Sequence, residues 1–498
     1  MNYVIGIDLG TSAVKVLLVS KSGEVVDELS KPYPLYHDKP GHSEQDPDDW
    51  VKETKSALKE LTGRLNEGDL VEGLSFSGQM HGLVLLDEDR KPLRRAILWN
   101  DTRTTKECRE IEANTGLDRL HELTKNPALE GFTLPKLMWV KKHEPEIFKQ
   151  ADVFLLPKDY VRFQLTGDIH MDYSDAAGTL LLNVAEKSWS KEVADANGIA
   201  FNLCPPLVGS HEQTGTISEE AADETGLSTN CKVFAGGADN ACGAIGSGIL
   251  EDGITLCSTG TSGVVLSYEA TGDRDFAGKV HYFNHGAPNV FYTMGVTLAA
   301  GYSLSWYKET FARDESFERL LEEAEESPAG AKGLLFTPYI VGERTPHADS
   351  EIRGTFTGVH ANHSRGDFTR AVLEGITFSL NETVENFREK GKSISKIISI
   401  GGGAKSSLWL QIQADIFGAE VVTLESEQGP GMGAAMLAAF GCGWYPSLKD
   451  CADTFVGEAA SYQPNPEDRM LYLKLFNIYQ EVYGKTKSIH HRLGEFRA

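Results

Sequence analysis

Two aspartates beside short turns of small residues are the first candidates for chemistry. Asp8 interrupts an apolar strand pattern, and Gly10, Thr11 and Ser12 follow at once, with Lys15 nearby as a local cation. Backbone N–H groups and hydroxyls in such a turn suit the oxygens of a phosphate. A carboxylate beside a phosphate is repelled unless a divalent cation lies between them, so Asp8 predicts Mg²⁺ bound to the phosphates of a nucleotide.

The same residues also have structural interpretations. A Gly-Thr-Ser turn can simply close a hairpin, with its hydroxyls bonded to their own backbone, and an aspartate can cap the turn that follows it. A second copy of the turn, Thr259, Gly260 and Thr261, occurs in the other half of the chain. The repetition favours paired phosphate-binding turns over two unrelated hairpins.

A second carboxylate lies in the sequence GGADNACG, at residues 236–243, where a strand pattern ends and a helix pattern begins. Ligands of α/β proteins bind at the ends of sheet strands. Asp239 could therefore take a proton from a substrate hydroxyl, while Asn240 holds a neighbouring hydroxyl. Because aspartate is also a common helix N-cap, a purely structural role for Asp239 is the competing interpretation.

The loop SGQMHG, at residues 77–82, follows another strand pattern and has side chains that suit a polyol. Gln79 and His81 could form hydrogen bonds with hydroxyl groups, and Met80 could pack against carbon atoms. A lone histidine is more often structural than functional, so a role in packing is the alternative for His81.

Two glycine-rich loops occur in the second half. Gly402, Gly403 and Ala404 lie between a strand pattern and a helix pattern, where such loops bring the backbone close to a nucleotide. The sequence GPGMGA at residues 429–434 has the spacing of a dinucleotide fingerprint, but Pro430 lies inside the turn and no βαβ unit opens there. We therefore expect no nicotinamide site, and the absence of G-x-x-x-x-G-K-[ST] excludes a P-loop enzyme.

These loops need strands and helices to position them. Asp46 as N-cap and periodic apolar residues predict a helix that ends near residue 65, and further helices are expected at 367–390 and 466–483. Residues 7–19 and 256–268 share a strand, a Gly-Thr-Ser turn and a second strand, about half the chain apart. We therefore predict an α/β protein with two related domains, residues 1–247 and 248–498, packed along a cleft.

Composition narrows the classes of partner. The chain has 48 lysines and arginines against 72 aspartates and glutamates, and its net charge of −24 disfavours nucleic acid and anionic membrane surfaces. No apolar run is long enough to span a membrane, and the first residues lack the features of a signal peptide. The seven cysteines lack metal-site spacing, which predicts reduced thiols and a cytoplasmic protein. The sequence leaves open whether the chain forms a homodimer.

Taken together, the motifs resemble the FGGY family of carbohydrate kinases, which has the actin-like ATPase fold. The resemblance extends over nearly the whole chain through GIDLGTSAVK, SGQMHG, GGADNACGAIGSG, STGTSG and SIGGGAKSSLW, in this order. Two longer family patterns agree, the first at Gly131, Thr133, Lys136 and Trp139, the second at Gly354, Phe356, Gly358, Asp367, Ala371 and Glu374. The resemblance implies two ribonuclease-H-like domains with a cleft between them.

The resemblance also implies a reaction. Within the family, ILWND, LPKDY and SDAAGT are most similar to members that use ATP to phosphorylate D-xylulose to D-xylulose 5-phosphate. Asp239 would then be the general base, Asp8 and Asp239 would hold Mg²⁺, and Met80, His81 and Asn240 would contact the sugar. Residues 10–12 and 260–261 would bind phosphates, and residues 402–404 would lie at the adenosine.

Other activities stay open at this point. Another ketopentose, such as ribulose, could be the substrate of the same site. An actin-like ATPase without a sugar substrate would also bind ATP, but it would have no need of the polyol loop. The sequence offers few cations near the candidate sugar contacts, so we expect a sugar acid such as gluconate to be a poor substrate.

Overall fold

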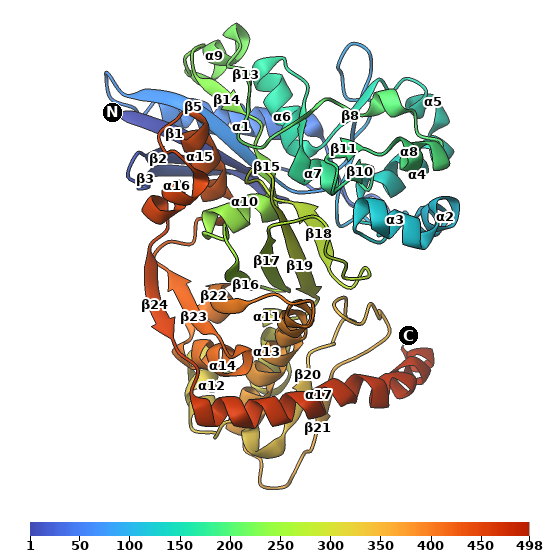
Figure 1. The fold of residues 1–498 in the computed structure, drawn as a ribbon, viewed down its shortest axis with the longest axis vertical. Helices are drawn as coiled ribbons and strands as arrows, with labels where there is room; N and C mark the ends of the chain where they lie inside the picture. Colours follow the sequence, from blue (N-terminus) through green and yellow to red (C-terminus); the bar gives the residue numbers. More distant parts are fainter. Residues whose placement is uncertain (498) are drawn as a thin grey trace.

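The computed structural model describes residues 1–497 and contains two seven-stranded sheets (Figure 1). The first sheet consists of β1 (Asn2–Leu9), β2 (Ala13–Ser20), β3 (Val25–Pro32), β5 (Leu70–Gly78), β13 (Gln213–Thr216), β14 (Lys232–Phe234) and β15 (Gly237–Ala238). The second consists of β16 (Gly253–Thr259), β17 (Gly263–Glu269), β18 (His281–Asn284), β19 (Phe291–Thr297), β22 (Ile394–Gly401), β23 (Glu420–Leu424) and β24 (Glu458–Tyr462).

The two sheets share one internal topology. In the first sheet, β14, β5 and β1 run parallel to one another, and the pairs β1–β2 and β2–β3 are antiparallel. The strands β23, β22, β16, β17 and β19 repeat this order and these directions in the second sheet. This duplication confirms the prediction of two related α/β units, whereas the boundary at residue 247 stays a prediction.

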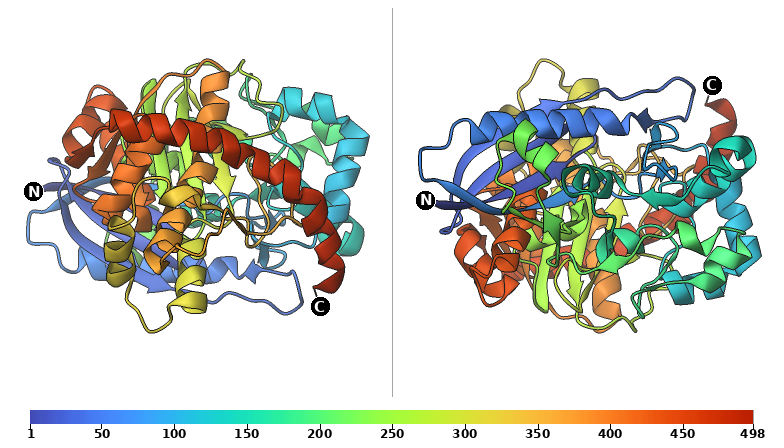
Figure 2. Two further views of the ribbon diagram at one scale, coloured as in Figure 1. Left: turned by 90° about the horizontal axis from the view of Figure 1, so that it is seen from below. Right: turned by 90° about the horizontal axis from the view of Figure 1, so that it is seen from above.

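Helices pack around both sheets, with α1 along the first sheet and α17 across the opposite end of the molecule (Figure 2). The helices are α1 (Pro47–Thr62), α2 (Thr105–Thr115), α3 (Leu117–Thr124), α4 (Thr133–His143), α5 (Pro145–Phe148), α6 (Pro157–Thr166), α7 (Tyr173–Ala177), α8 (Lys191–Ala196), α9 (Glu219–Thr225), α10 (Asp239–Gly246), α11 (Gly301–Phe311), α12 (Phe317–Glu325), α13 (Arg365–Glu389), α14 (Ser407–Phe417), α15 (Gly429–Gly441), α16 (Leu448–Phe455) and α17 (Pro466–Leu493). Short strands form two-stranded sheets outside the two large ones: β4 (Glu44–Gln45), β6 (Val84–Leu86), β7 (Ala96–Ile97), β8 (Val153–Leu155), β9 (Met171–Asp172), β10 (Leu182–Asn183), β11 (Ser188–Trp189), β12 (Leu207–Val208), β20 (Leu335–Thr337) and β21 (Thr355–Thr357).

The three helices predicted from periodicity are present. Helix α1 begins after its N-cap, Asp46, whose carboxylate accepts a hydrogen bond from a backbone N–H of the first turn. A capping box of Ser364 and Asp367 starts α13 two residues before its predicted beginning. Helix α17 extends past the predicted end at residue 483 because its buried face continues from Val482 to His490.

Helix α15 comes from the second half of the sequence, yet it packs against β1 and β5 of the first sheet (Figure 1). A Cβ on Gly6 of β1 would lie 2.1 Å from the carbonyl oxygen of Gly431, and a Cβ on Gly433 would lie 1.9 Å from that of Cys242 in α10. Gly6 therefore allows contact between the backbones of β1 and α15, and Gly433 allows contact between those of α15 and α10. This packing gives Gly433 of the GPGMGA sequence a structural role.

Two expectations from composition concern covalent links and membranes. Each of the seven cysteines has a free thiol. None of the helices formed by residues 1–497 combines the length and the apolar character that a membrane crossing requires.

The backbone contact of α15 predicts a large cost for one added methyl group. We expect Gly433→Ala to destabilise the protein by about 3 kcal/mol or more, because the new Cβ would overlap the carbonyl of Cys242. The matched control is Gly484→Ala in α17, where a Cβ meets no heavy atom within 4 Å, and which should stabilise by about 0.5–1 kcal/mol. Urea denaturation measures both, and equal stabilities of the two variants would contradict the contact.

Candidate active site

A cavity of about 340 Å³ lies between the two units, and both contribute to its walls. From the first unit come Met80, His81, Trp99, Asn100, Asp101, Thr102, Leu129, Glu130, Gly131, Phe132, Asp239 and Asn240. From the second come Ser262, Val264, His281, Phe283, Met294, Val296 and Arg344. The structure therefore brings four predicted residues together, namely Met80, His81, Asp239 and Asn240. We call this space the sugar cavity, after the ligand class that the sequence predicts for these residues.

Asp239 is the first residue of α10, and Ala238 occupies the N-cap position. Its Oδ1 accepts hydrogen bonds from the backbone N–H of Asn240 at 2.7 Å and from Asn240 Nδ2 at 3.2 Å. The competing interpretation of Asp239 as the N-cap is therefore wrong. Burial, and to a smaller extent the charge of Asp8, raises the pKa of Asp239 to about 7. A carboxyl group with this pKa can accept a proton near neutral pH.

Asp8 lies on β1, directly opposite Lys15 on β2 and Ser77 on β5. Burial raises the pKa of Asp8, while the neighbouring Ser77 side chain and the charge of Lys15 lower it. The Lys15 ammonium donates to Gln428 Oε1 at 2.6 Å and lies 3.2 Å from a carboxylate oxygen of Glu28. Lys15 is thus engaged with protein side chains, and its contact with a phosphate stays a prediction.

His81 has a left-handed backbone conformation, with φ of 70°. Its Nδ1 lies 2.7 Å from the carbonyl oxygen of Gly178, which can only accept, so Nδ1 carries the proton. Burial, and after it the charge of Lys136, lowers the pKa of His81 to about 3. The imidazole is therefore neutral, and Nε2 is left as an acceptor for a hydroxyl group.

Aromatic rings surround this imidazole and supply the apolar part of the cavity wall. The ring centroid of His81 lies 4.7 Å from that of Phe132, and His281 stacks on Phe283 at 5.6 Å. Asn240 Nδ2 lies 3.5 Å from the sulfur of Met80, which fixes the two side chains against each other. Such a wall matches the mixed surface of a sugar, with C–H groups against rings and hydroxyls against polar atoms.

Gln79 does not line the sugar cavity. Its side-chain amide donates to Gln45 Oε1 at 2.9 Å, and the same oxygen accepts from Trp50 Nε1 at 3.0 Å. The Gln79 side chain is almost fully buried beneath the loop that carries Met80 and His81. Contact of Gln79 with a sugar stays a prediction without support from this arrangement.

A second cavity, of about 550 Å³, lies within the second unit next to the turn between β16 and β17. Five predicted residues line it: Thr259, Gly260, Thr261, Gly402 and Gly403. The remaining wall comes from Gly301, Tyr302, Leu304, Ser305, Phe317, Glu318, Leu321, Lys405, Ser406 and Trp409. Glycine backbone and hydroxyl side chains at one end and apolar side chains elsewhere fit the phosphates and the base of a nucleotide. Ala404 is not part of this lining.

The first turn, with Gly10, Thr11 and Ser12, lines neither cavity. Thr11 Oγ1 accepts a hydrogen bond from Trp99 Nε1 at 3.0 Å, and the carbonyl oxygen of Gly10 accepts one from the Tyr33 hydroxyl. Trp99 itself lines the sugar cavity. The indole therefore connects the first turn to the sugar cavity, while phosphate binding by this turn stays a prediction.

Sequence reasoning missed several residues of the sugar cavity. Phe132 lies inside the segment of the first family pattern, and Trp99 and Asp101 lie inside ILWND, so these motifs already marked their region. Arg344 belongs to no motif, yet it lines the cavity, and its charge lowers the pKa values of His81 and His281. Arg344 corrects the argument against a sugar acid, which relied on a lack of nearby cations.

Comparisons with known sequences connect this geometry to known proteins. The N-terminal domain of the FGGY family of carbohydrate kinases matches residues 3–246, and the C-terminal domain of that family matches residues 255–442. The xylulose kinase of Bacillus subtilis (strain 168) is 59% identical over 498 residues, which is 100% of both chains.

Solved structures with the same fold include kinases of more than one sugar. The ligand-bound xylulose kinase from Lactobacillus acidophilus has a TM-score of 0.94 at 28% identity, covering 99% of this chain and 100% of that one. A gluconate kinase from the same organism also reaches 0.94, at 29% identity and with 99% of each chain covered. Overall shape therefore does not distinguish the sugar, and the residues of the cavity must do so.

The raised pKa of Asp239 predicts a pH-dependent gain in stability when its charge is removed. Its folded-state pKa of about 7 exceeds the ordinary 3.8, so its stabilising effect is complete below about pH 4 and is lost as the pH rises through 7. Asp239→Asn should therefore stabilise the protein more at pH 8 than at pH 5, by about 2–3 kcal/mol. Urea denaturation at both pH values measures this difference.

The control is Asp118→Asn, which changes an exposed aspartate in the first turn of α3. We expect its effect on stability to be small and nearly the same at pH 5 and pH 8. A pH-independent effect of Asp239→Asn would contradict the burial of an ionisable carboxylate at this position.

Proposed function

Because the chain belongs to the FGGY family of carbohydrate kinases, we propose that it transfers the terminal phosphoryl group of ATP to D-xylulose, giving D-xylulose 5-phosphate. The observation that carries this proposal is Asp239, a carboxyl group with a pKa near 7 in a cavity that also presents a neutral imidazole. The identity of the sugar is supported by the 59% identity with a xylulose kinase.

Asp239 acts on the hydroxyl that is phosphorylated. As that hydroxyl attacks the terminal phosphorus, the carboxylate accepts its proton, and the bond from phosphorus to the leaving oxygen of ADP breaks. His81 Nε2 accepts a hydrogen bond from another hydroxyl, and Asn240 binds a neighbouring one. The aromatic rings Phe132 and Phe283 exclude water from one side of the sugar.

The nucleotide is a substrate, and the second cavity fits it. Its volume of about 550 Å³ and its apolar side chains, including Phe317, Leu321 and Trp409, suit an adenosine group. The backbone of Gly260 and Thr261 at one end suits the phosphates. Because the β16–β17 turn contributes Gly260 to this cavity and Ser262 to the sugar cavity, phosphates held there would lie next to the sugar.

Asp8 and Asp239 also fit a divalent cation. Each carries an oxygen-donor group, and the charge of Asp8 raises the pKa of Asp239, as expected for neighbouring carboxylates that repel each other. Mg²⁺ bound with the nucleotide would neutralise charge on the phosphates during transfer. The free thiols of all seven cysteines are compatible with the cytoplasmic location that we propose for this reaction.

The role of Asp239 as base predicts a specific loss of turnover. Asp239→Asn keeps the shape of the side chain but cannot accept the proton, so kcat should fall by about 10²–10⁴-fold. In the parent protein, kcat/KM should fall about tenfold per pH unit below about pH 7, because the protonated carboxyl is inactive. Coupled detection of ADP release measures both. Asp118→Asn again serves as control, and near-normal turnover of Asp239→Asn would exclude this assignment.

The sugar cavity predicts a ranking of acceptors. D-xylulose should have the highest kcat/KM, ribulose a lower value, and glycerol a poor one, because unfilled polar groups of the cavity lose their partners. Gluconate is the critical comparison, since Arg344 could bind its carboxylate. ADP release with each compound at equal concentration gives the ranking. A higher kcat/KM for gluconate would overturn xylulose as the substrate and leave the kinase activity in place, whereas ATP turnover that ignores every sugar would favour an ATPase.

A further inference from the structure

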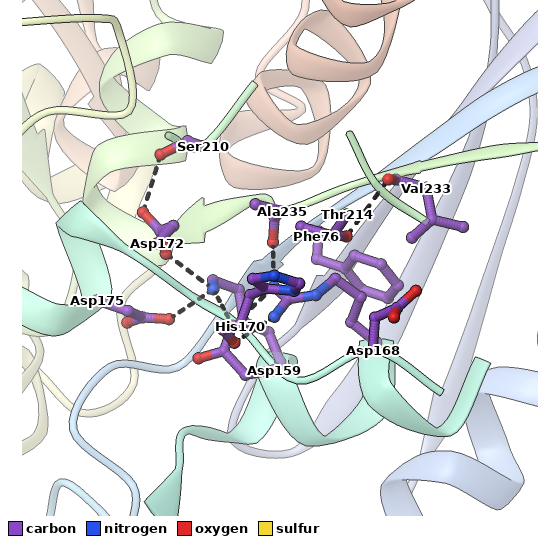
Figure 3. Close-up of polar contacts among 12 residues, drawn as sticks. Phe76, Asp159, Asp168, His170, Asp172, Asp175, Ser210, Thr214, Val233 and Ala235 are labelled. Carbon is purple, nitrogen blue, oxygen red and sulfur yellow. Dashed lines mark hydrogen bonds and ion pairs between the residues drawn. The ribbon is translucent and has the colours of Figure 1, made fainter. Parts of the chain in front are cut away.

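The chain segment that leads from β14 to Asp239 is held by three hydrogen bonds to one buried polar cluster, which consists of Lys158, Asp159, Arg162, Asp172, Ser174, Asp175 and Ser210. Figure 3 shows the bond at Ala235 and the cluster below it. The carbonyl oxygen of Ala235 accepts from Arg162 Nη1 at 2.7 Å, and the N–H of Gly236 donates to the carbonyl oxygen of Ser210 at 2.9 Å. The N–H of Ala238 donates to Ser174 Oγ at 2.9 Å. Since Ala238 precedes Asp239 directly, this last bond is the one closest to the catalytic carboxylate.

The centre of the cluster is the ammonium group of Lys158 from α6. Its Nζ lies 2.7 Å from Asp159, 2.8 Å from Asp172 and 3.1 Å from Asp175, and all four side chains are completely buried. Three carboxylates this close resemble a metal site, but the ammonium already occupies the point where they converge. Burial and the two neighbouring carboxylates raise the pKa of Asp175 against the opposing effect of Lys158. The cluster is thus a structural ion group and has no vacant place for a metal.

Ser174 connects Asp172 of the cluster to the segment that carries Asp239. Asp172 Oδ2 accepts hydrogen bonds from Ser174 Oγ at 2.5 Å and from Ser210 Oγ at 2.8 Å. The single proton of the Ser174 hydroxyl is therefore directed at Asp172, and its lone pairs are left to accept from the N–H of Ala238. Ser174 cannot rotate away from Ala238 without giving up its bond to a charged acceptor.

The backbone before Asp239 does not by itself fix the direction of this segment. Strand β15 has only two residues, and Gly236 has a positive φ of 78°. A Cβ on Gly236 would lie 2.3 Å from the carbonyl oxygen of Phe76, so the backbone passes close to β5 at this point. A short strand after a glycine turn needs further contacts to hold its direction, and the cluster provides them.

We propose that Ser174 is a positioning residue that holds the start of α10, and with it the Asp239 carboxylate, in line with the attacking hydroxyl of the substrate. The proposal rests on the proposed function, because Ser174 lies outside both cavities and acts only through Asp239. Loss of the Ser174 hydroxyl leaves the buried N–H of Ala238 without its acceptor, and the start of α10 shifts to find another. A displacement of about 1 Å at a reacting group can lower a rate by about 10²-fold.

The test compares Ser174→Ala with Ser210→Ala. Both variants remove a buried hydroxyl that donates to the same oxygen of Asp172, but only the Ser174 hydroxyl accepts from Ala238. We expect Ser174→Ala to lower kcat at least about tenfold, with KM for ATP and for D-xylulose within about threefold of the parent values. Ser210→Ala should keep kcat within about threefold. Rates are expressed per nucleotide-binding site, measured by calorimetry, so that unfolded protein does not contribute.

The pH profile supplies a readout that a loss of stability alone would not change. Ser174→Ala should move the acid limb of kcat, because the surroundings of the Asp239 carboxylate change, whereas Ser210→Ala should leave it in place. If Ser174→Ala yields too little folded protein, Ser174→Cys replaces the oxygen by a weak acceptor of similar size and carries the same expectation. Equal kcat and equal pH profiles for the Ser174 and Ser210 variants would overturn the proposal. Failure of the proposed function is distinguishable, because Asp239→Asn would then keep its activity.

Discussion

The contact between the backbones of β1, α10 and α15 determines where both carboxylates lie. Asp8 belongs to β1 and Asp239 opens α10, so the distance between them depends on how closely these elements approach α15. Gly6 and Gly433 permit that approach, because a methyl group at either position would overlap a carbonyl oxygen. The site of chemistry thus depends on residues that have no side chain, some of them almost 200 positions apart from Asp239 in sequence.

The carboxyl group of Asp239 differs in its surroundings from the buried charges nearby. Lys158 and Arg162 supply positive charge within a few ångströms of the three buried aspartates, and the raised pKa of Asp175 favours its neutral form. Asp239 has no such cation among the causes of its pKa shift, and burial dominates. A charge left partly uncompensated is costly to the folded state, but it gives a group that changes protonation near neutral pH. The compensated cluster and the uncompensated carboxylate are connected through Ser174 and Ala238.

Local patterns in the sequence were sufficient to predict the repeated strand-turn-strand units and the helices α1 and α13, because caps and apolar periodicity act over a few residues. They also placed Met80, His81, Asp239 and Asn240 at strand ends that meet in one cavity. Gln79 lies outside that cavity, because its side chain bonds to Gln45 in a distant segment that no local pattern connects to it. Arg344 was not foreseen for the same reason, since a lone arginine in an irregular segment becomes part of the site only through the tertiary fold.

The packing of α15 also has a consequence for synthesis of the chain on the ribosome. Val4, Leu17 and Val19 of the first sheet are buried in one apolar cluster with Met432, Ala435 and Met436 of α15. These two groups are separated by more than 400 residues, so the first sheet emerges long before the helix that covers it. Until then, one apolar face of the nascent first unit has no partner, and it is open to chaperones or to aggregation. The first unit can therefore complete its folding only after the C-terminal part of the chain has been synthesised.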